Sequence, residues 1–273
     1  VLAMSLCCVI FSPSTTRFYN NSADTGGALF INNAKTVLVL KSIFARNMAY
    51  KSSSVIDIDR NNIFKAIHTT FTNNIGPLSH GAVSLRNSDF NVIHACKFSW
   101  NSVYSQGIFH YKTANMIMIS NSIAIGNSVL QGDGGVLKIN SAEYVYLNNS
   151  HFVKNRAPGN GGAIFAISLR VFHVYISHFI NQSSLSSGGC MATVEVDTIV
   201  LSKCTINSNY ARQEGGALMI LEAKHVFILK SSFIGNHAGT HGGVIAMKYI
   251  DVLENCLSSY YNNTAKLDGA AMY

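Results

Sequence analysis

Residues 233–245 read FIGNHAGTHGGVI, and this stretch contains the two signals that decide the fold. The first signal is Phe-x-x-Asn, and the second is Gly-Gly followed by a small residue and an aliphatic residue. Both signals return along the chain at steps of 26, 27 or 28 residues. A fixed period of this length indicates a repeat protein, in which each repeat is one structural unit.

The glycine pair is complete in six repeats and weaker in the others. The complete copies begin at Gly26, Gly134, Gly161, Gly188, Gly215 and Gly242. The weaker copies keep Gly81 (after His80), Gly107 or Gly269, and Ser53-Ser54 replaces the pair in one repeat. The second position of the pair falls at residues 27, 54, 81, 107, 135, 162, 189, 216, 243 and 269, which gives ten repeats.

The Phe-x-x-Asn signal keeps the same period independently. Six repeats have both residues, at Phe18/Asn21, Phe44/Asn47, Phe71/Asn74, Phe98/Asn101, Phe152/Asn155 and Phe233/Asn236. Variants fill the remaining places at Ala124/Asn127, Phe179/Gln182, Ile206/Asn209 and Tyr260/Asn263. In most repeats an apolar run rich in β-branched residues, such as Thr198-Ile199-Val200-Leu201, lies between the two signals.

Each repeat therefore predicts three short strands separated by Gly, Asn and Ser turns, with no helical periodicity. Three strands cannot close on themselves, but stacked copies can pair every strand with those above and below. We predict an all-β, right-handed parallel β-helix of about ten coils of 27 residues, with coils spaced by about 4.8 Å. The alternative solenoid is the leucine-rich repeat, which requires the pattern L-x-x-L-x-L-x-x-N. In this chain the glycine pair and a third predicted strand stand in place of that pattern.

The Asn positions are interpreted as a structural ladder. Stacked side-chain amides at a turn can hydrogen-bond along the rod and satisfy the turn backbone. The Phe three residues earlier is expected to stack on its counterparts inside the coil, and the glycines allow positive φ or a close backbone approach. The predicted ladder consists of Asn21, Asn47, Asn74, Asn101, Asn127, Asn155, Asn209, Asn236 and Asn263.

Composition excludes several classes of protein. The chain of 273 residues is 48% hydrophobic, so it can bury a core and is not intrinsically disordered. Only 12% of residues are charged, which argues against a helical bundle or a coiled coil. The net charge of +7 is scattered without a long basic run, so nucleic-acid binding is not expected.

The six cysteines and the first residues leave alternatives open. Cys7, Cys8, Cys96, Cys190, Cys204 and Cys256 form no C-x-x-C pair, and no Cys/His cluster has zinc spacing. Buried apolar thiols are favoured over a disulfide framework, and neither a metal nor a cofactor is expected. We predict a single β-helix domain over residues 1–273, interpreted as a fragment of a longer repeat protein. Residues 1–17 are either an atypical first coil or a signal-peptide remnant, and they are too short to span a membrane.

The two signals at this spacing resemble the repeats of chlamydial polymorphic outer membrane proteins. They are also similar to the right-handed β-helix, pectin-lyase-like repeats of many uncharacterised eukaryotic surface proteins. The resemblance covers essentially the whole chain and implies the β-helix fold. The bacterial family further implies an adhesive domain displayed outside the cell.

Outward positions lie three and five residues after the second glycine, between apolar inward positions. In the second to fifth repeats these positions bring acid, base and His together, and the weak catalytic candidates there are Asp57, Asp59, Arg86, His110 and Lys112. Two carboxylates on one strand are compatible with a glycoside hydrolase pair. The favoured interpretation is a solvated surface with charge pairs between neighbouring coils.

The same outward columns become apolar in the sixth to ninth repeats. The candidate binding residues there are Phe165, Ile167, Val194, Met219 and Leu221. A contiguous apolar stripe of this size usually marks an interaction site, for a partner or for self-association. A missing flanking segment or a strand twist that turns these positions inward is the alternative.

The sequence therefore predicts an extracellular or cell-surface module with a structural, adhesive or binding role and no catalytic activity. The alternative is a carbohydrate-active enzyme, either a polysaccharide lyase or a glycoside hydrolase, at the polar face. Expected partners are a protein or a carbohydrate at a cell surface. Sequons at Asn20, Asn148, Asn181 and Asn262 would be usable for glycosylation in a eukaryotic secretory pathway.

Overall fold

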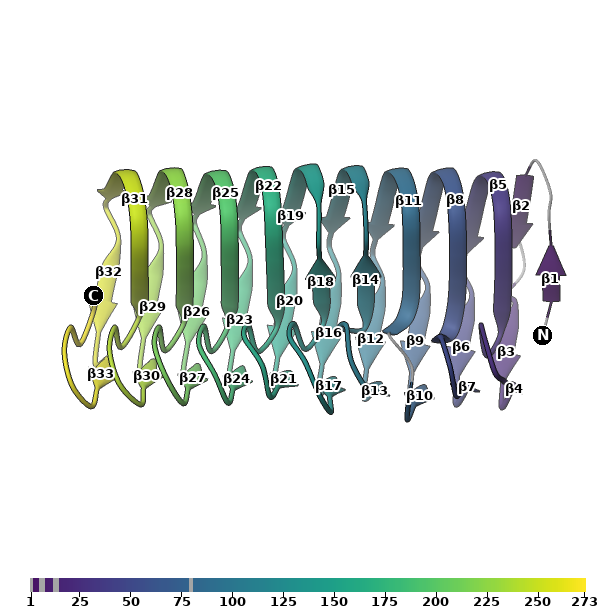
Figure 1. Cartoon of the computed structure of the whole chain (residues 1–273), viewed down its shortest axis with the longest axis horizontal. Helices are drawn as coiled ribbons and strands as arrows, with labels where there is room; N and C mark the ends of the chain where they lie inside the picture. The colour runs from purple at the N-terminus through teal and green to yellow at the C-terminus, as the bar shows by residue number, and fades with distance from the viewer. Residues whose placement is uncertain (1, 5–7, 12–14, 79–80) are drawn as a thin grey trace.

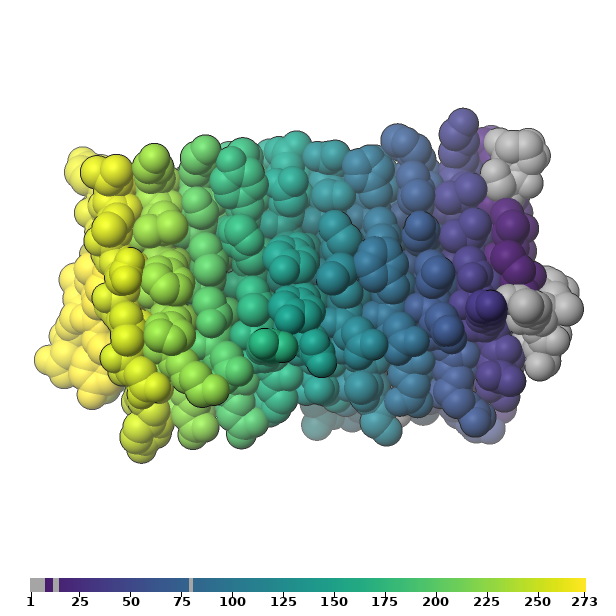
Figure 2. All heavy atoms as spheres, turned by 90° about the horizontal axis from the view of Figure 1, so that it is seen from above, coloured from purple at the N-terminus to yellow at the C-terminus, as the bar shows by residue number. Residues whose placement is uncertain are grey.

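The computed structural model describes residues 2–4, 8–11, 15–78 and 81–273; Cys7 and His80 lie outside the described residues. All regular structure in this part of the chain is β-strand, and the strands stack in parallel as a straight rod (Figure 1). The predicted all-β parallel solenoid is confirmed. The coils form continuous layers along the rod (Figure 2).

The described strands belong to three parallel sheets. Sheet A contains β1 (Leu2–Met4), β2 (Cys8–Phe11), β5 (Leu29–Leu40), β8 (Ser53–Ile67), β11 (Gly81–His94), β14 (Phe109–Tyr111), β15 (Ala114–Ser120), β18 (Leu137–Ile139), β19 (Ala142–Asn148), β22 (Ile164–Tyr175), β25 (Met191–Ser202), β28 (Leu218–Leu229) and β31 (Ile245–Cys256).

The other two sheets contain shorter strands. Sheet B contains β3 (Arg17–Tyr19), β6 (Ile43–Ala45), β9 (Thr70–Thr72), β12 (Lys97–Ser99), β16 (Ile123–Ile125), β20 (His151–Val153), β23 (His178–Ile180), β26 (Thr205–Asn207), β29 (Ser232–Ile234) and β32 (Ser259–Tyr261). Sheet C contains β4 (Ser22–Ala23), β7 (Met48–Ala49), β10 (Ile75–Gly76), β13 (Ser102–Val103), β17 (Ser128–Val129), β21 (Arg156–Ala157), β24 (Ser183–Ser184), β27 (Tyr210–Ala211), β30 (His237–Ala238) and β33 (Thr264–Ala265).

Each coil follows the order sheet A, sheet B, sheet C. We number coils one to nine by their sheet A strands, which start at β5, β8, β11, β14, β18, β22, β25, β28 and β31. Neighbouring coils pair with an offset of 27 residues in most places, as Ile164 with Met191 shows. Strands β1 and β2, within the segment 1–17, pair with β5 as a further layer before coil one.

The path within a coil differs from the predicted three strands in two ways. In most coils the first two predicted strands join into one long sheet A strand, which bends at a left-handed residue such as Ser168 (φ 55°) in β22. The pairing between β22 and β25 omits this residue: Ile167 pairs with Val194, and Leu169 pairs with Val196. A two-residue sheet C strand, which we had not predicted, follows the ladder Asn.

The glycine pair is required at the turn into sheet A. Gly161 has a φ of +67°, a conformation that side chains disfavour. A Cβ on Gly162 would overlap the carbonyl oxygen of Gly189 in the next coil. In coil two, Ser53-Ser54 replaces the pair, and the register there shifts as in a β-bulge.

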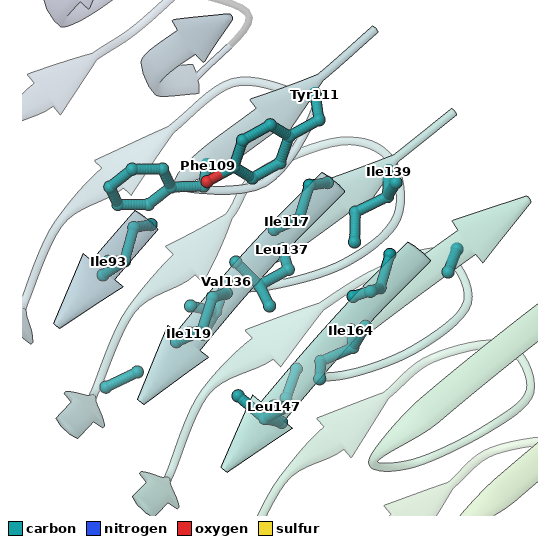
Figure 3. Close-up of a cluster of buried hydrophobic side chains, with 14 of the residues drawn as sticks. Ile93, Phe109, Tyr111, Ile117, Ile119, Val136, Leu137, Ile139, Leu147 and Ile164 are labelled. Carbon is teal, nitrogen blue, oxygen red and sulfur yellow. The ribbon is translucent and has the colours of Figure 1, made fainter. Parts of the chain in front are cut away.

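The core is a column of aromatic and aliphatic side chains along the rod. The rings of Phe44 and Phe71 are stacked with centroids 5.0 Å apart, and Phe98 follows at 5.3 Å. In coil four Ala124 occupies the aromatic position, and the Phe109 ring packs edge-on against Phe98 at 4.8 Å. Figure 3 shows Phe109 and Tyr111 pointing into this part of the core.

Candidate functional site

The Asn column forms a continuous hydrogen-bonded ladder inside the turn between sheets B and C. The backbone N–H and Nδ2 of Asn101 donate to Asn127 Oδ1 at 3.1 and 2.9 Å, and Nδ2 also donates to the Phe71 carbonyl at 3.0 Å. From Asn21 to Asn236, each backbone N–H donates to the side-chain oxygen of the next member; the column consists of Asn21, Asn47, Asn74, Asn101, Asn127, Asn155, Gln182, Asn209, Asn236 and, as the last acceptor, Asn263. Asn101 is fully buried, so this amide supports the fold and cannot meet a ligand.

A second ladder, which sequence reasoning missed, lies at the turn between sheets A and B. Its members share a small hydroxyl or thiol side chain: Ser42, Thr69, Cys96, Ser122, Ser150, Ser177, Cys204, Ser231 and Ser258. The Ser122 backbone N–H donates to Ser150 Oγ at 3.2 Å, and Ser122 Oγ donates to the Ser120 carbonyl at 2.8 Å. The regular recurrence at about 27 residues was the available signal.

The described cysteines are free thiols. Burial raises the pKa of Cys96 to about 12 and that of Cys204 to about 11, so both stay protonated at neutral pH. Cys96 Sγ donates to the Ala66 carbonyl at 3.2 Å, as a serine hydroxyl would. These two thiols act as members of the second ladder, because a protonated buried thiol is a poor nucleophile.

The candidate polar face contains one closed ion-pair cluster. Asp57 pairs in register with Ser84, and Asp59 with Arg86. The Arg86 guanidinium lies 3.0 Å from Asp57 Oδ1 and 3.8 Å from Asp59 Oδ1. Asp57 also accepts a hydrogen bond from Ser52 Oγ.

Asp57 is buried although it points away from the core. Only 1% of its surface is exposed. Burial raises the pKa of the Asp57 carboxyl, and the Ser52 hydroxyl and the Arg86 charge lower that pKa in part. A buried carboxylate whose oxygens face Ser52 and Arg86 can anchor Arg86, but it has no open path to a substrate.

The other two polar candidates lie outside this ion-pair cluster. His110 pairs in register with Ser84 and Lys138, and its Nε2 lies 3.4 Å from Asn140 Nδ2. Lys112 follows the end of β14 and is exposed. The structure therefore joins Asp57, Asp59 and Arg86 in one ion-pair cluster.

The candidate apolar residues form two adjacent columns on the outer face of sheet A. Phe165 and Met219 flank Ala192 in one column, while Ile167, Val194 and Leu221 follow one another in the other. All five candidates are partly buried. Lys138 Nζ lies 5.4 Å from the centre of the Phe165 ring and shields part of its face. Larger exposed apolar side chains lie elsewhere, for example Trp100 at 59%.

The segment from sheet B of coil five to sheet A of coil six contains the buried Phe152, the ladder residue Asn155 and the pair Gly161-Gly162. Residues 149–167 match the Chlamydia polymorphic membrane protein repeat. The other coils repeat this geometry, so the chain resembles that family in fold and in motif. Neither a curated protein nor a solved structure matches the chain.

In the part of the chain that the structure describes, no group of three or more His, Cys, Asp or Glu side chains could hold a metal ion. No helix in the same residues is long and apolar enough to cross a membrane.

Proposed function

We propose that the chain is a non-catalytic structural and binding module of an extracellular or cell-surface protein. The observation that carries this proposal is the closed Asp57–Arg86 ion pair, since it removes one carboxylate of the best acid and base cluster from reach of a substrate. The likeness to a polymorphic membrane protein repeat supports the surface location. The module binds a protein or a carbohydrate and needs no cofactor.

The experiment compares binding with turnover. Fluorescently labelled chain is incubated with cultured cells and with extracellular matrix, and retained fluorescence is measured against a labelled globular protein. In parallel, unlabelled chain is incubated with pectin, alginate and a glycosaminoglycan, and released reducing or unsaturated ends are assayed. Retention without turnover is expected; turnover, or no retention on any surface, contradicts the proposal.

A second candidate function, a polysaccharide lyase or glycoside hydrolase, is favoured by one observation. Asp59 stays partly exposed beside Arg86 and the buried Asp57, so a carboxylate and a guanidinium meet on one face. The decisive variant is Asp57→Asn with Asp59→Asn. Turnover that disappears in this variant, while the melting temperature is kept, would establish the enzyme.

The apolar columns supply a proposed contact for a partner or for a second copy. In this proposal Phe165, Ile167, Val194, Met219 and Leu221 form the contact. Phe165→Ser with Leu221→Ser is expected to make the protein more monodisperse in light scattering and to keep its melting temperature. An unmodified chain that is monomeric at high concentration, or a variant that unfolds, would assign these residues to folding.

A further inference from the structure

A groove runs along the rod at the bend of sheet A. The left-handed residue in the long strands, such as Asn33 or Glu222, turns the strand, and this residue lines the groove together with residues that follow it. Three depressions lie on this line: over coils one to three, over coils three to five, and over coils seven to nine. The second shares Asp89 with the first.

The middle depression combines a polar residue and an apolar residue from each of three successive coils. Its lining is Asp89 and Phe90, Asn115 and Met116, and Glu143 and Tyr144. The apolar residues are in register, because Phe90 pairs with Met116 and Met116 with Tyr144. The same chemistry therefore recurs at the strand spacing of about 4.8 Å.

The polar side chains of this depression have unused hydrogen-bonding capacity. Asn115 Nδ2 donates to Asp89 Oδ1 at 3.4 Å, which leaves the other Asp89 oxygen and the Asn115 oxygen open. Neither Asp89 nor Glu143 forms an ion pair with any residue that the structure describes. Arg170 lies 5.7 Å from the centre of the Tyr144 ring and bounds the depression toward coil six.

We propose that this groove binds a neutral linear glycan that lies along the rod axis. Carboxylate and amide groups accept and donate hydrogen bonds to sugar hydroxyls, and Phe90, Met116 and Tyr144 pack against the C–H faces of the sugar rings. The lining repeats once per coil, so each coil can contact one sugar unit. This inference rests on the proposed function and names the ligand class of the module.

Two features disfavour other polymers. A peptide binds a sheet through unpaired backbone groups at an edge. The strands below this groove are paired on both sides, as β15 is with β11 and β19, so they offer no such groups. An acidic polysaccharide would be repelled by Asp89 and Glu143, which carry the only charges among the six residues of the depression.

The test uses the whole chain with cellohexaose, xylohexaose and laminarihexaose as probes in isothermal titration calorimetry. At least one probe is expected to bind with a Kd below about 1 mM. Tyr144→Ala is expected to weaken this binding about tenfold or more, and Asn115→Ala is a second variant that changes only an exposed side chain. Tyr210→Ala, an exposed tyrosine in sheet C, is the matched control and should bind normally.

The outcomes separate this inference from the proposed function. Absence of binding by all three hexaoses, or binding that is equal in Tyr144→Ala and in the unmodified chain, overturns the groove assignment. Tighter binding of oligogalacturonate or of an oligolysine peptide also overturns it. If no hexaose binds but labelled Tyr144→Ala still binds cells, the glycan assignment of the groove is wrong and the proposed surface module stands. Cleavage of a hexaose would instead contradict the proposal that the module is non-catalytic.

Discussion

Coils six to eight and coils two to four solve the same stacking problem with different regularity. In coils six to eight each sheet A strand is continuous, and complete glycine pairs stand at each turn between them. In coils two to four Ser53-Ser54 replaces one pair, and β14 and β15 are separate strands; the aromatic column is interrupted in both regions, by Ala124 here and by Ile206 in coil seven. Both regions nevertheless keep the two buried ladders without a break.

The comparison teaches that the two ladders determine the backbone path of each coil. The volume of the core side chains is balanced within a coil. Ala124 is small, and Phe109 in the same coil is larger than the aliphatic residues at its position in neighbouring coils, Val83 and Leu137. The Phe109 ring fills space beside Phe98 that a larger residue at 124 would occupy. A departure is therefore tolerated when a neighbouring side chain compensates for its volume.

The largest expected effect comes from placing a serine, the residue of the irregular turn in coil two, at a glycine of the regular region. Gly162→Ser should lower the free energy of unfolding by about 4 kcal/mol or more, because its Cβ meets backbone rather than a movable side chain. The matched change in the irregular coil, Ser54→Gly, should alter stability by about 1 kcal/mol or less, since the bulge accommodates either residue. Urea unfolding followed by circular dichroism measures both; equal losses would mean that the two turns do not differ.

Breaking the ladder should have the next largest effect. Asn101→Leu should cost about 3 kcal/mol, because Asn74 loses its acceptor and the Phe71 carbonyl loses a donor in a buried site. Asn62→Leu, at an exposed position outside the ladder, should change stability by about 0.5 kcal/mol or less. Similar shifts in the melting temperature for both variants would contradict a structural ladder.

The volume compensation in coil four should appear as coupling between two substitutions. Ala124→Phe alone should clash with Phe109, and Phe109→Leu alone should leave a cavity. The double variant should recover about 2 kcal/mol relative to the sum of the single changes, as contacting residues do. A double-mutant cycle in urea that gives additive losses would show that the two positions are independent.

The smallest expected effect is a stabilisation in the irregular region. The Tyr111 hydroxyl is fully buried and has no hydrogen-bond partner among the described residues. Its neighbours in the same column, Leu85 and Ile139, are apolar. Tyr111→Phe should therefore raise the free energy of unfolding by about 1 kcal/mol, while Tyr210→Phe at the surface should leave it unchanged. A loss of stability in Tyr111→Phe would reveal a partner for the hydroxyl.

The sequence could predict the coil because its turns use residues with specific backbone roles. The glycine pair and the buried Asn recur at sites where few other residues fit, so their period was readable. The bend of sheet A could not be read, because Asn33, Ser168 and Glu195 all adopt the left-handed conformation there without a glycine to mark it. The second ladder was hidden by its mixture of Ser, Thr and Cys.

The candidate sites were less predictable than the fold. Alternation along a strand says which way Asp57 points, but it does not say that Ser52 and Arg86 close over it. Tyr144 follows the break between β18 and β19, and no sequence pattern grouped it with Asp89 and Glu143. The register between coils correctly predicted which residues stack on one another. It could not predict which of them are covered by turns and long side chains.

The nearest-neighbour character of the coils bears on how such a rod can change its length in evolution. Each coil pairs with the one before and the one after, so a segment such as 163–189 is a complete layer that starts and ends at equivalent turns. Recombination between two such turns would remove or duplicate the layer in frame, and the ladders would close again with the next coil. The rod would shorten or lengthen in steps of about 4.8 Å, with each step adding or deleting one unit of its outer surface.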